Sequence, residues 1–361
     1  MLALEDAVDQ AVLAPSVHNT QPWLFVPHPD RLEVRANRSR QLTAVDPLGR
    51  ELVQSVGAAL LNARVALSAR GWAVEVERLP RAADPELMAV VYPVAGPADP
   101  ALADLYPMIA RRRTNRRRFQ RASLADVNLD RLGEIAGIED VILIPLAQRH
   151  RRLVASMTWR ADRIQNADPA YRAELRTWTT RTTADGDGIV ATTVPHVDGT
   201  ARGDVPLRDF DTQGKGALPA ETHSGVDQTM VLLATHGDDP HAWLRSGEAL
   251  ERLLLELTRR DCVASPITQA IEVPLTRRIL RMALTRREYP QTLLRIGRAE
   301  PTPATPRRRR GEVVENSTRA PEPALTPPGR ARTQLPPWPD PSTGDQASRP
   351  VSDGRGGSTW L

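Results

Sequence analysis

The stretch Ala14-Pro-Ser-Val-His-Asn-Thr-Gln-Pro-Trp23 places hydroxyl, amide and imidazole side chains between two prolines. Each proline fixes its own φ angle and restricts the residue before it, so we expect a rigid loop. Asn19 and Gln21 each carry hydrogen-bond donors and an acceptor, which suits a heterocycle whose edge alternates carbonyl oxygens with ring nitrogens. The alternative is a turn in which Ser16 and Asn19 bond their own backbone.

The segments on either side of this loop have helical and strand patterns. Apolar residues recur at helical spacing from residue 2 to residue 12, and this helix is expected to end where Ala14 precedes Pro15. Residues 23–26 and 32–35 flank a Pro-His-Pro-Asp turn, which predicts two paired strands. Further along, residues 50–70 predict a long apolar helix, and residues 73–77 alternate like another strand.

The long helical pattern has an echo 190 positions later. Gly57, Ala59, Leu60, Leu67 and Arg70 recur as Gly247, Ala249, Leu250, Leu257 and Arg260. A period of this length is typical of two related lobes and not of a solenoid. The echo therefore predicts an internal duplication, with a chance match between two apolar helices as the alternative.

The second lobe is expected to begin near residue 105 and to end near residue 315. Its patterns predict strands at 141–144 and 292–296, and helices at 153–164, 171–179, 243–260 and 275–284. Residues 184–225 are rich in Gly, Asp, Thr and Pro, and a loop this long is usually functional or disordered. The predicted organisation is a first lobe over 1–104, a second over 105–315, and a disordered Pro-, Arg- and Ser-rich tail over 316–361.

Residues 111–119 read Arg-Arg-Arg-Thr-Asn-Arg-Arg-Arg-Phe. Guanidinium groups form bidentate, charge-assisted hydrogen bonds with phosphate oxygens, and a neighbouring hydroxyl adds another donor. This run therefore predicts a phosphate site, and the alternative is an exposed basic helix end. A nucleic-acid binder would interleave aromatic side chains with the arginines, whereas this run has only Phe119, so no nucleic-acid partner is expected.

Composition favours a globular protein in a reducing compartment. The chain has 361 residues, of which 40% are hydrophobic, and can bury a sizeable core. Cys262 is its only cysteine, which excludes an internal disulfide, a Cys-X-X-Cys pair and a thiolate zinc cluster. The acidic, helical start of the chain does not have the pattern of a signal peptide, and no stretch predicts a membrane span. We therefore expect a cytoplasmic protein with no membrane anchor and no metal.

The pattern Pro-Ser-X-X-Asn-X-Gln-Pro-Trp resembles the flavin-contacting loop of the FMN-dependent nitroreductase family. It is supplied here by Pro15, Ser16, Asn19, Gln21, Pro22 and Trp23. The resemblance implies that Ser16 and Asn19 reach the isoalloxazine ring, and that the loop crosses to the partner subunit's flavin in homodimeric members. His18 stands at a variable place in the pattern and is predicted to be a loop residue and not a catalyst.

The arginine run resembles the Arg-X-Ser/Thr-X-Arg motif of the same family, with Arg112, Thr114 and Arg116 in the motif positions and Arg113 as a rival to Arg112. Family members usually carry this motif at the start of the chain, whereas here it follows the Pro-Ser loop. That order fits a duplication in which the first lobe keeps the flavin-ring loop and the second keeps the phosphate-binding arginines.

A third match is Asp261-Cys-Val-Ala-Ser-Pro-Ile-Thr-Gln-Ala270. In the family a similar place carries a turn whose backbone lies against the flavin and donates an amide hydrogen to N5. The resemblance implies that Pro266, Ile267, Thr268 and Gln269 line the flavin. The family commonly has Gly near 261, and an acidic residue with Gly near 268 and 269. This chain departs from that pattern, so the backbone amides of Thr268 and Gln269 are both candidates for the hydrogen bond to N5.

The end of the second lobe resembles the family's closing strand and its terminal phosphate-contacting arginine. The matching segments are 294–298, 305–308 and 311–314. One of Arg307 and Arg308 is therefore predicted to contact the phosphate.

Among nitroreductases, this order of motifs most resembles the Acg-type proteins of mycobacteria and their actinobacterial relatives, in which one chain mimics the usual dimer. The resemblance implies an α+β fold with a central antiparallel sheet and long buried helices, one FMN per chain, and residues 184–225 as a candidate lid.

The implied activity is transfer of a hydride from NAD(P)H to FMN N5 and onward reduction of a nitroaromatic, quinone or similar acceptor by a monomer or homodimer. The flavin carries this chemistry, so the resemblance implies no particular catalytic side chain. The alternative is a protein that stores FMN beneath a closed lid.

Overall fold

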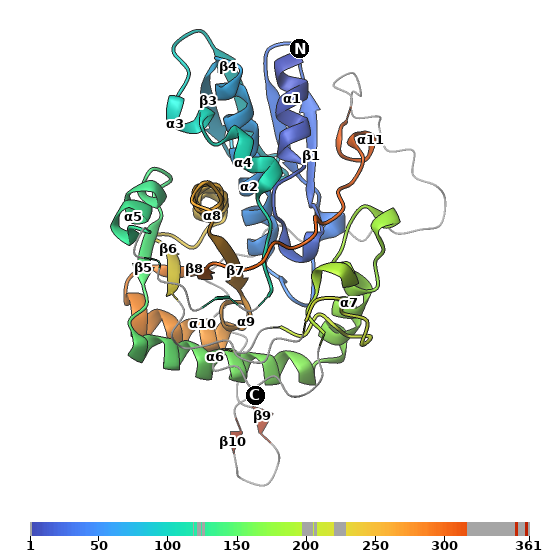
Figure 1. Cartoon of the computed structure of the whole chain (residues 1–361), viewed down its shortest axis with the longest axis vertical. Coiled ribbons are helices and arrows are strands. Elements are labelled where there is room, and N and C mark those ends of the chain that lie inside the picture. Colours follow the sequence, from blue (N-terminus) through green and yellow to red (C-terminus); the bar gives the residue numbers. More distant parts are fainter. Residues whose placement is uncertain are drawn as a thin grey trace. The chain divides into compact units, whose positions relative to one another are not determined.

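The computed structural model contains one four-stranded antiparallel sheet in each predicted lobe (Figure 1). It describes residues 2–117, 119–120, 124, 127–196, 205, 208–219 and 229–315, with the backbone of 351–352 and 358–359. The chain divides into one unit over Met1–Ala320 and another over Pro321–Leu361. In the latter, β9 (Val351–Ser352) pairs antiparallel with β10 (Ser358–Thr359). The rest of the predicted tail, 316–361, lies outside the described residues.

The first sheet contains the predicted hairpin at one edge. Its strands are β1 (Trp23–Pro27), β2 (Leu32–Ala36), β3 (Ala73–Arg78) and β4 (Leu87–Val94), in the order β1-β2-β4-β3. Helix α1 (Leu2–Ala11) packs against helix α2 (Arg50–Ala69), which connects β2 to β3 along the chain. Strand β4 was not predicted, because its first five residues are all buried and show no polar alternation.

The second sheet repeats this arrangement. Its strands are β5 (Ile142–Pro145), β6 (Thr229–Thr235), β7 (Val263–Ile267) and β8 (Tyr289–Gly297), in the order β5-β6-β8-β7. Helix α8 (Pro240–Arg259) connects β6 to β7, as α2 connects β2 to β3. Both sheets thus have the spatial order first, second, fourth, third, with a long helix between their second and third strands.

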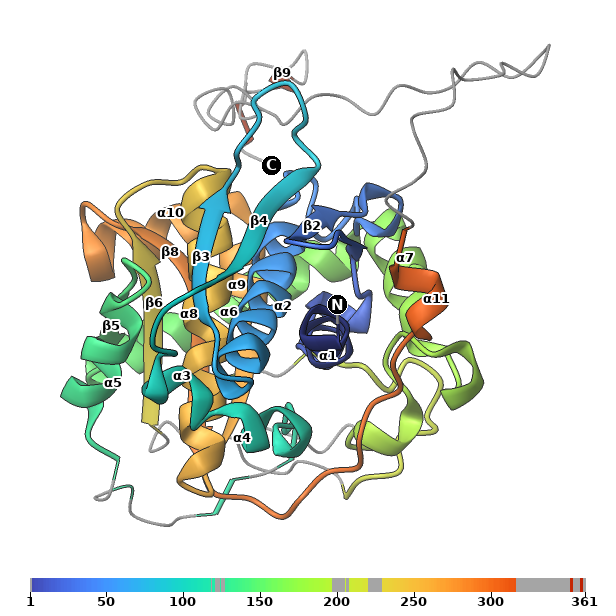
Figure 2. The ribbon, with the colours of Figure 1, turned by 90° about the horizontal axis from the view of Figure 1, so that it is seen from above.

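The two long helices pack against each other where each has a glycine (Figure 2). A Cβ on Gly57 of α2 would lie 2.1 Å from the carbonyl oxygen of Leu244, and a Cβ on Gly247 of α8 would lie 2.0 Å from that of Gln54. Residues 54 and 244 are again 190 positions apart, so the two contacts are equivalent. Only glycine permits this close approach of two backbones.

Side chains on the two faces of the second sheet enter two different cores. In β6, Val231 and Leu233 pack with α5 (Leu129–Gly137) and α8, whereas Met230 and Leu232 pack with α6 (Gln148–Ala167). Both faces are therefore covered, and the strand is a continuous apolar run. Because such a run has no alternation of polar and apolar residues, the sequence pattern did not predict β6 as a strand.

Shorter helices cover the sheets and the ends of the long helices. They are α3 (Pro100–Ala103), α4 (Tyr106–Arg111), α7 (Pro169–Thr179), α9 (Gln269–Glu272), α10 (Pro274–Leu280) with a π-helical turn over Arg281–Thr285, and α11 (Arg310–Val313). Single 3-10 turns lie at Val17–Asn19, Arg38–Arg40, Thr183–Asp185 and Ala191–Thr193. Figure 1 shows α6 running beside α9 and α10, against which it packs.

The predicted α+β class is confirmed, and so are the antiparallel strands and the long buried helices. The strands form two sheets, however, and not a single central one. Among the described residues, α2 alone is long and apolar enough to cross a membrane, and 89% of its apolar window is buried inside the fold. Its length and composition are thus those of a core helix.

Candidate active site

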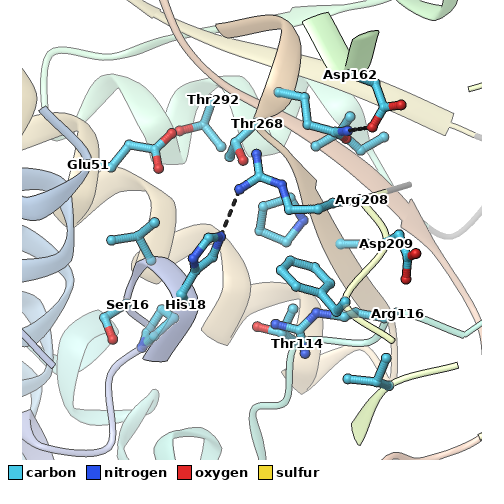
Figure 3. Close-up of a pocket in the computed structure, with 18 of the residues that line it drawn as sticks. Ser16, His18, Glu51, Thr114, Arg116, Asp162, Arg208, Asp209, Thr268 and Thr292 are labelled. Carbon is cyan, nitrogen blue, oxygen red and sulfur yellow. Dashed lines mark hydrogen bonds between the residues drawn. The ribbon is translucent and has the colours of Figure 1, made fainter. Parts of the chain in front are cut away.

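Both halves of the chain line a cavity of about 450 Å³ (Figure 3). The first half contributes the Pro-Ser loop and one face of α2. The second half contributes the start of the strand-to-helix turn after β7, part of α6, and residues from the predicted lid. The predicted site residues that line the cavity are Pro15, Ser16, Thr114, Arg116, Pro266, Ile267, Thr268 and Gln269.

The Pro-Ser loop has an unusual backbone. His18, Asn19 and Gln21 have φ angles of 45°, 55° and 50°, in the left-handed region that non-glycine residues rarely adopt. The Ser16 hydroxyl holds this conformation by accepting a hydrogen bond from the Gln21 backbone N–H at 2.9 Å. Such backbone conformations persist when surrounding bonds fix them, and they concentrate at functional sites.

Asn19 and Gln21 bind neighbouring backbone and do not line the cavity. The Asn19 amide donates to the carbonyl of Gly188 at 3.0 Å, and the Gln21 amide donates to that of Gly186 at 2.8 Å. Gln21 Oε1 also accepts from the backbone N–H of Arg308 at 2.8 Å. These two predicted flavin contacts therefore tie the loop to the first residues of the predicted lid and to the segment around residue 308.

Arg112 and Arg307 form a buried cationic pair next to the loop. Their Nη2 atoms donate to the carbonyl oxygen of Leu13, at 3.4 and 3.0 Å. Within the described residues, Arg112 Nε and Nη1 and Arg307 Nε are buried without a hydrogen-bond partner. Burial, followed by the charge of Arg112, lowers the pKa of Arg307 to about 9. Arg307 Nη1 and Nη2 also donate to Asn19, Thr305, Pro306 and Ala14, so only the three nitrogens without a partner are left for a further acceptor.

One carboxylate, Glu251 of α8, faces this pair. Its Oε1 lies 3.4 Å from Arg112 Nε, and its side chain is fully buried. Burial raises the pKa of Glu251 to about 7, although Arg112 opposes that shift.

The other predicted arginines lie elsewhere. Arg113 donates to the carbonyl oxygens of Ala110 and Arg112, at 2.8 and 2.7 Å. Arg308 donates to the carbonyls of Gln21 and Glu312. None of Arg112, Arg113, Arg307 and Arg308 lines the cavity itself.

Arg116 lies inside the cavity, with its guanidinium 4.8 Å from the ring centre of Phe210. Burial, followed by the charge of Arg208, lowers the pKa of Arg116 to about 10. Among the described residues, no carboxylate forms an ion pair with it.

The turn after β7 presents the third predicted motif to the cavity. The Thr268 hydroxyl donates to Glu272 Oε1 at 2.5 Å, and the Gln269 amide donates to Asp162 Oδ1 at 2.9 Å. These bonds hold the side chains, so the segment offers mainly backbone and apolar surface to a ligand.

Described parts of the predicted lid also reach the cavity. Arg208 bonds His18 Nε2 at 2.7 Å and forms an ion pair with Glu272, which links the Pro-Ser loop to α9 (Figure 3). The Phe210 ring meets the His18 ring edge to face at 5.5 Å. Residues 197–204, 206–207 and 220–225 of the predicted lid lie outside the described residues.

Several cavity residues escaped the sequence analysis. His18 was predicted to be only a loop residue, yet it lines the cavity, and burial lowers its pKa well below the usual value. Glu51, Gln54 and Ser55 of α2 also line it. An acidic residue at the start of an otherwise apolar, buried helix is the one signal that could have indicated Glu51.

The fold and the cavity define an α+β protein with two antiparallel sheets of the same strand order, whose two halves line one cavity. The chain is similar to Rv3131 of Mycobacterium tuberculosis, whose name classes it among the NAD(P)H nitroreductases. The two are 35% identical over 319 residues, which cover 84% of this chain and 89% of that protein. The protein acg of the same organism, named likewise, is 29% identical over 318 residues, covering 86% of this chain and 94% of its own length.

Similarity to Rv3131 shows that the chain belongs to the nitroreductase family and is an oxidoreductase of the nitroreductase type, as the motifs predicted. Among solved structures, the FMN- and NADPH-dependent nitroreductase NfnB of Sphingopyxis sp. strain HMH aligns with a TM-score of 0.38 at 16% identity, covering 58% of this chain and 97% of NfnB. No protein-family model matches the chain.

Proposed function

We propose that the protein is an FMN-dependent NAD(P)H oxidoreductase that reduces nitroaromatic, quinone or similar acceptors. The observation that carries the proposal is the pair Arg112 and Arg307, in which Arg112 Nε and Nη1 and Arg307 Nε are buried without a hydrogen-bond partner within the described residues. These donors lie beside the loop that lines the cavity. A terminal phosphate dianion would satisfy both the hydrogen bonds and the charge.

The residues present fit FMN better than FAD. No Gly-X-Gly-X-X-Gly loop accompanies the arginines, so nothing in the sequence indicates a pyrophosphate site. Arg112 and Arg307 would hold the phosphate, and Ser16, Thr114 and residues 266–269 would contact the rest of the cofactor. When bound, FMN supplies the two-electron redox chemistry, and the protein supplies orientation and electrostatics.

Family motifs assign Asn19 and Gln21 to the ring, but their hydrogen bonds support a different task. By fixing the left-handed turns of the loop, they hold Ser16 and His18 toward the cavity. Arg116 likewise stays a predicted phosphate ligand on the motif alone, whereas its place against Phe210 supports contact with the ring.

We further propose that one chain forms a complete site, because residues from both halves line the same cavity. The lobes 1–104 and 105–315 would then be the two halves of a duplicated unit, and the protein could act as a monomer or a homodimer. A cytoplasmic location fits the single cysteine and the need for NAD(P)H.

The test is direct. The purified chain should absorb as a flavoprotein, release FMN on denaturation, and bleach when NADPH or NADH is added without oxygen. Release of FAD, or protein without any flavin after reconstitution with FMN, would contradict the proposal.

The second candidate function is storage of FMN, and the bridge made by Arg208 favours it. Arg208 joins His18 to Glu272 across the cavity, with Phe210 beside it, and this arrangement leaves little room for nicotinamide. A storage protein should be nearly inert to NAD(P)H yet reducible by dithionite, and Arg208→Ala should then expose a hidden activity. Rapid-mixing reduction of the intact flavin by NAD(P)H would exclude storage as the main function.

A further inference from the structure

Glu51 reaches the cavity from the first turn of α2, with Arg50 Nη2 3.9 Å from its Oε1. Its side chain is 5% exposed. Within the described residues, neither carboxyl oxygen has a hydrogen-bond partner. Figure 3 shows this group pointing into the cavity on the side where Thr268 and Arg208 lie. An ionised carboxylate in such a place would lack hydrogen-bond donors from the described residues, which is costly.

Four charged groups act on Glu51. Glu272 of α9 and Asp46, which precedes α2, are negative, whereas Arg50 of α2 and Arg208 of the lid segment are positive. Three carboxyl groups therefore share two guanidinium groups. His18 lies in the same cavity, and burial, followed by the charges of Arg208 and Arg116, lowers its pKa well below the usual value. The negative charges of Glu272 and Asp46 disfavour ionisation of Glu51, so a proton held within this group of three carboxyls is favoured.

Hydrogen bonds decide which carboxyl group carries that proton. Asp46 Oδ2 accepts from the backbone N–H of Leu52 at 2.8 Å. Glu272 accepts from the Thr268 hydroxyl at 2.5 Å and from Arg208. These three bonds stabilise negative charge on Asp46 and Glu272, and Glu51 receives none within the described residues. Burial, followed by the charges of Glu272 and Asp46, raises the pKa of Glu51 well above its usual value.

We propose that Glu51 is the acid that protonates the acceptor reduced in this cavity; the inference rests on the proposed function. A quinone gains two electrons and one proton as a hydride from the reduced cofactor. The second proton comes from Glu51, whose O–H bond breaks as the O–H bond of the hydroquinone forms. Water then returns a proton to the carboxylate before the next turnover.

The test compares Glu51→Gln, which keeps the size and polarity of the side chain, with Glu134→Gln, the same change at an exposed position of α5. The FMN-loaded protein is reduced with one equivalent of dithionite and mixed without oxygen with 1,4-benzoquinone. We expect the Glu51→Gln flavin to be reoxidised about a hundredfold more slowly, the lower end of what general acids contribute.

The pH profile and the solvent isotope effect separate proton donation from a structural role. In the wild-type protein and in Glu134→Gln, reoxidation should be fast while Glu51 is protonated, and slow as the pH rises through its pKa. It should also slow in D₂O. Glu51→Gln should lose both dependences. Equal rates in Glu51→Gln and wild type across this pH range would overturn the inference alone, whereas no quinone reduction by the wild type would overturn the proposed function.

A second measurement does not require turnover. The infrared difference spectrum between the oxidised, FMN-loaded wild type and Glu51→Gln at neutral pH should contain a protonated carboxyl band, which the difference between wild type and Glu134→Gln lacks. Taking the difference removes the contribution of Glu251, whose pKa is also raised. Absence of the band from the Glu51→Gln difference would overturn the assignment of the proton. If Glu51→Gln does not fold, Glu51→Asp should keep the isotope effect at a reduced rate, and a wild-type rate in that variant would refute proton donation by Glu51.

Discussion

At the scale of single residues, buried charges without matched partners mark this site. The sequence singled out Arg112 or Arg113 and Arg307 or Arg308 as phosphate ligands, because of their resemblance to family motifs, but it left both choices open. Glu51 and His18 were not predicted as site residues, because only the packing of distant elements, including α9 and the lid segment, buries them in the cavity. A sequence pattern names the residue type, whereas its burial depends on elements that are distant in the chain.

The first prediction at this scale concerns the rival arginines 307 and 308. Arg307→Gln should weaken FMN binding about tenfold to hundredfold and riboflavin binding little, since a charge-assisted hydrogen bond contributes about 1.5–3 kcal/mol. Arg308→Gln is the matched control, because its guanidinium binds the carbonyls of Gln21 and Glu312. Fluorescence titration with both flavins measures the ratio. Equal losses for the two ligands in Arg307→Gln would show that the residue acts through folding.

A second prediction decides the role of Arg116, on which motif and cavity differ. If Arg116 binds phosphate, as the motif predicts, Arg116→Ala should weaken FMN binding far more than riboflavin binding. If Arg116 instead contacts the flavin ring, as its position against Phe210 indicates, Arg116→Ala should lower the affinity for both flavins by a similar factor. The same titration distinguishes these outcomes, with Arg117→Ala as the control, since Arg117 donates to the Pro301 carbonyl.

At the scale of elements, the long helices and the hairpin could be predicted, whereas the buried strands β4 and β6 could not. The apolar period of α2 and α8 spans 20 residues in each and is hard to mistake. Strands β4 and β6 lie inside their sheets and carry apolar residues on successive positions, so they lack the alternation that predicts a strand. The lid segment has no period, and its path depends on bonds to Asn19, Gln21 and His18.

The helix crossing yields a prediction about stability. Gly57→Ala should destabilise the protein by about 1–3 kcal/mol or more, because the added methyl group would meet the Leu244 carbonyl. Gly133→Ala in α5 is the matched control: nothing lies within 4 Å of its Cβ position, and alanine favours a helix by up to about 1 kcal/mol. Urea unfolding compares the two variants. A Gly57→Ala protein as stable as the wild type would mean that the helices do not cross this closely.

At the scale of the whole described unit, the two halves have the same strand order but different chemistry at equivalent places. Ala58 of α2 and Thr268 after β7 line the cavity. The residue 190 positions after Ala58 is Glu248 of α8, and the residue 190 positions before Thr268 is Arg78 of β3. Arg78 Nε donates to Glu248 Oε2 at 2.7 Å. Arg64 joins the same carboxylate at 2.7 Å. Ion pairs thus fill the place equivalent to the cavity.

The last prediction follows from that difference: the chain should bind one FMN and not two. The Glu248 side chain is fully buried, and a second flavin would have to separate it from Arg64 and Arg78. Leaving a buried charge unpaired costs about 3–5 kcal/mol, which would offset much of the binding free energy of a second cofactor. Equilibrium dialysis against excess FMN, with the protein concentration from amino-acid analysis, should therefore saturate at one flavin per chain. Saturation at two would show that the ion pairs open to admit a flavin and that both halves keep a working site.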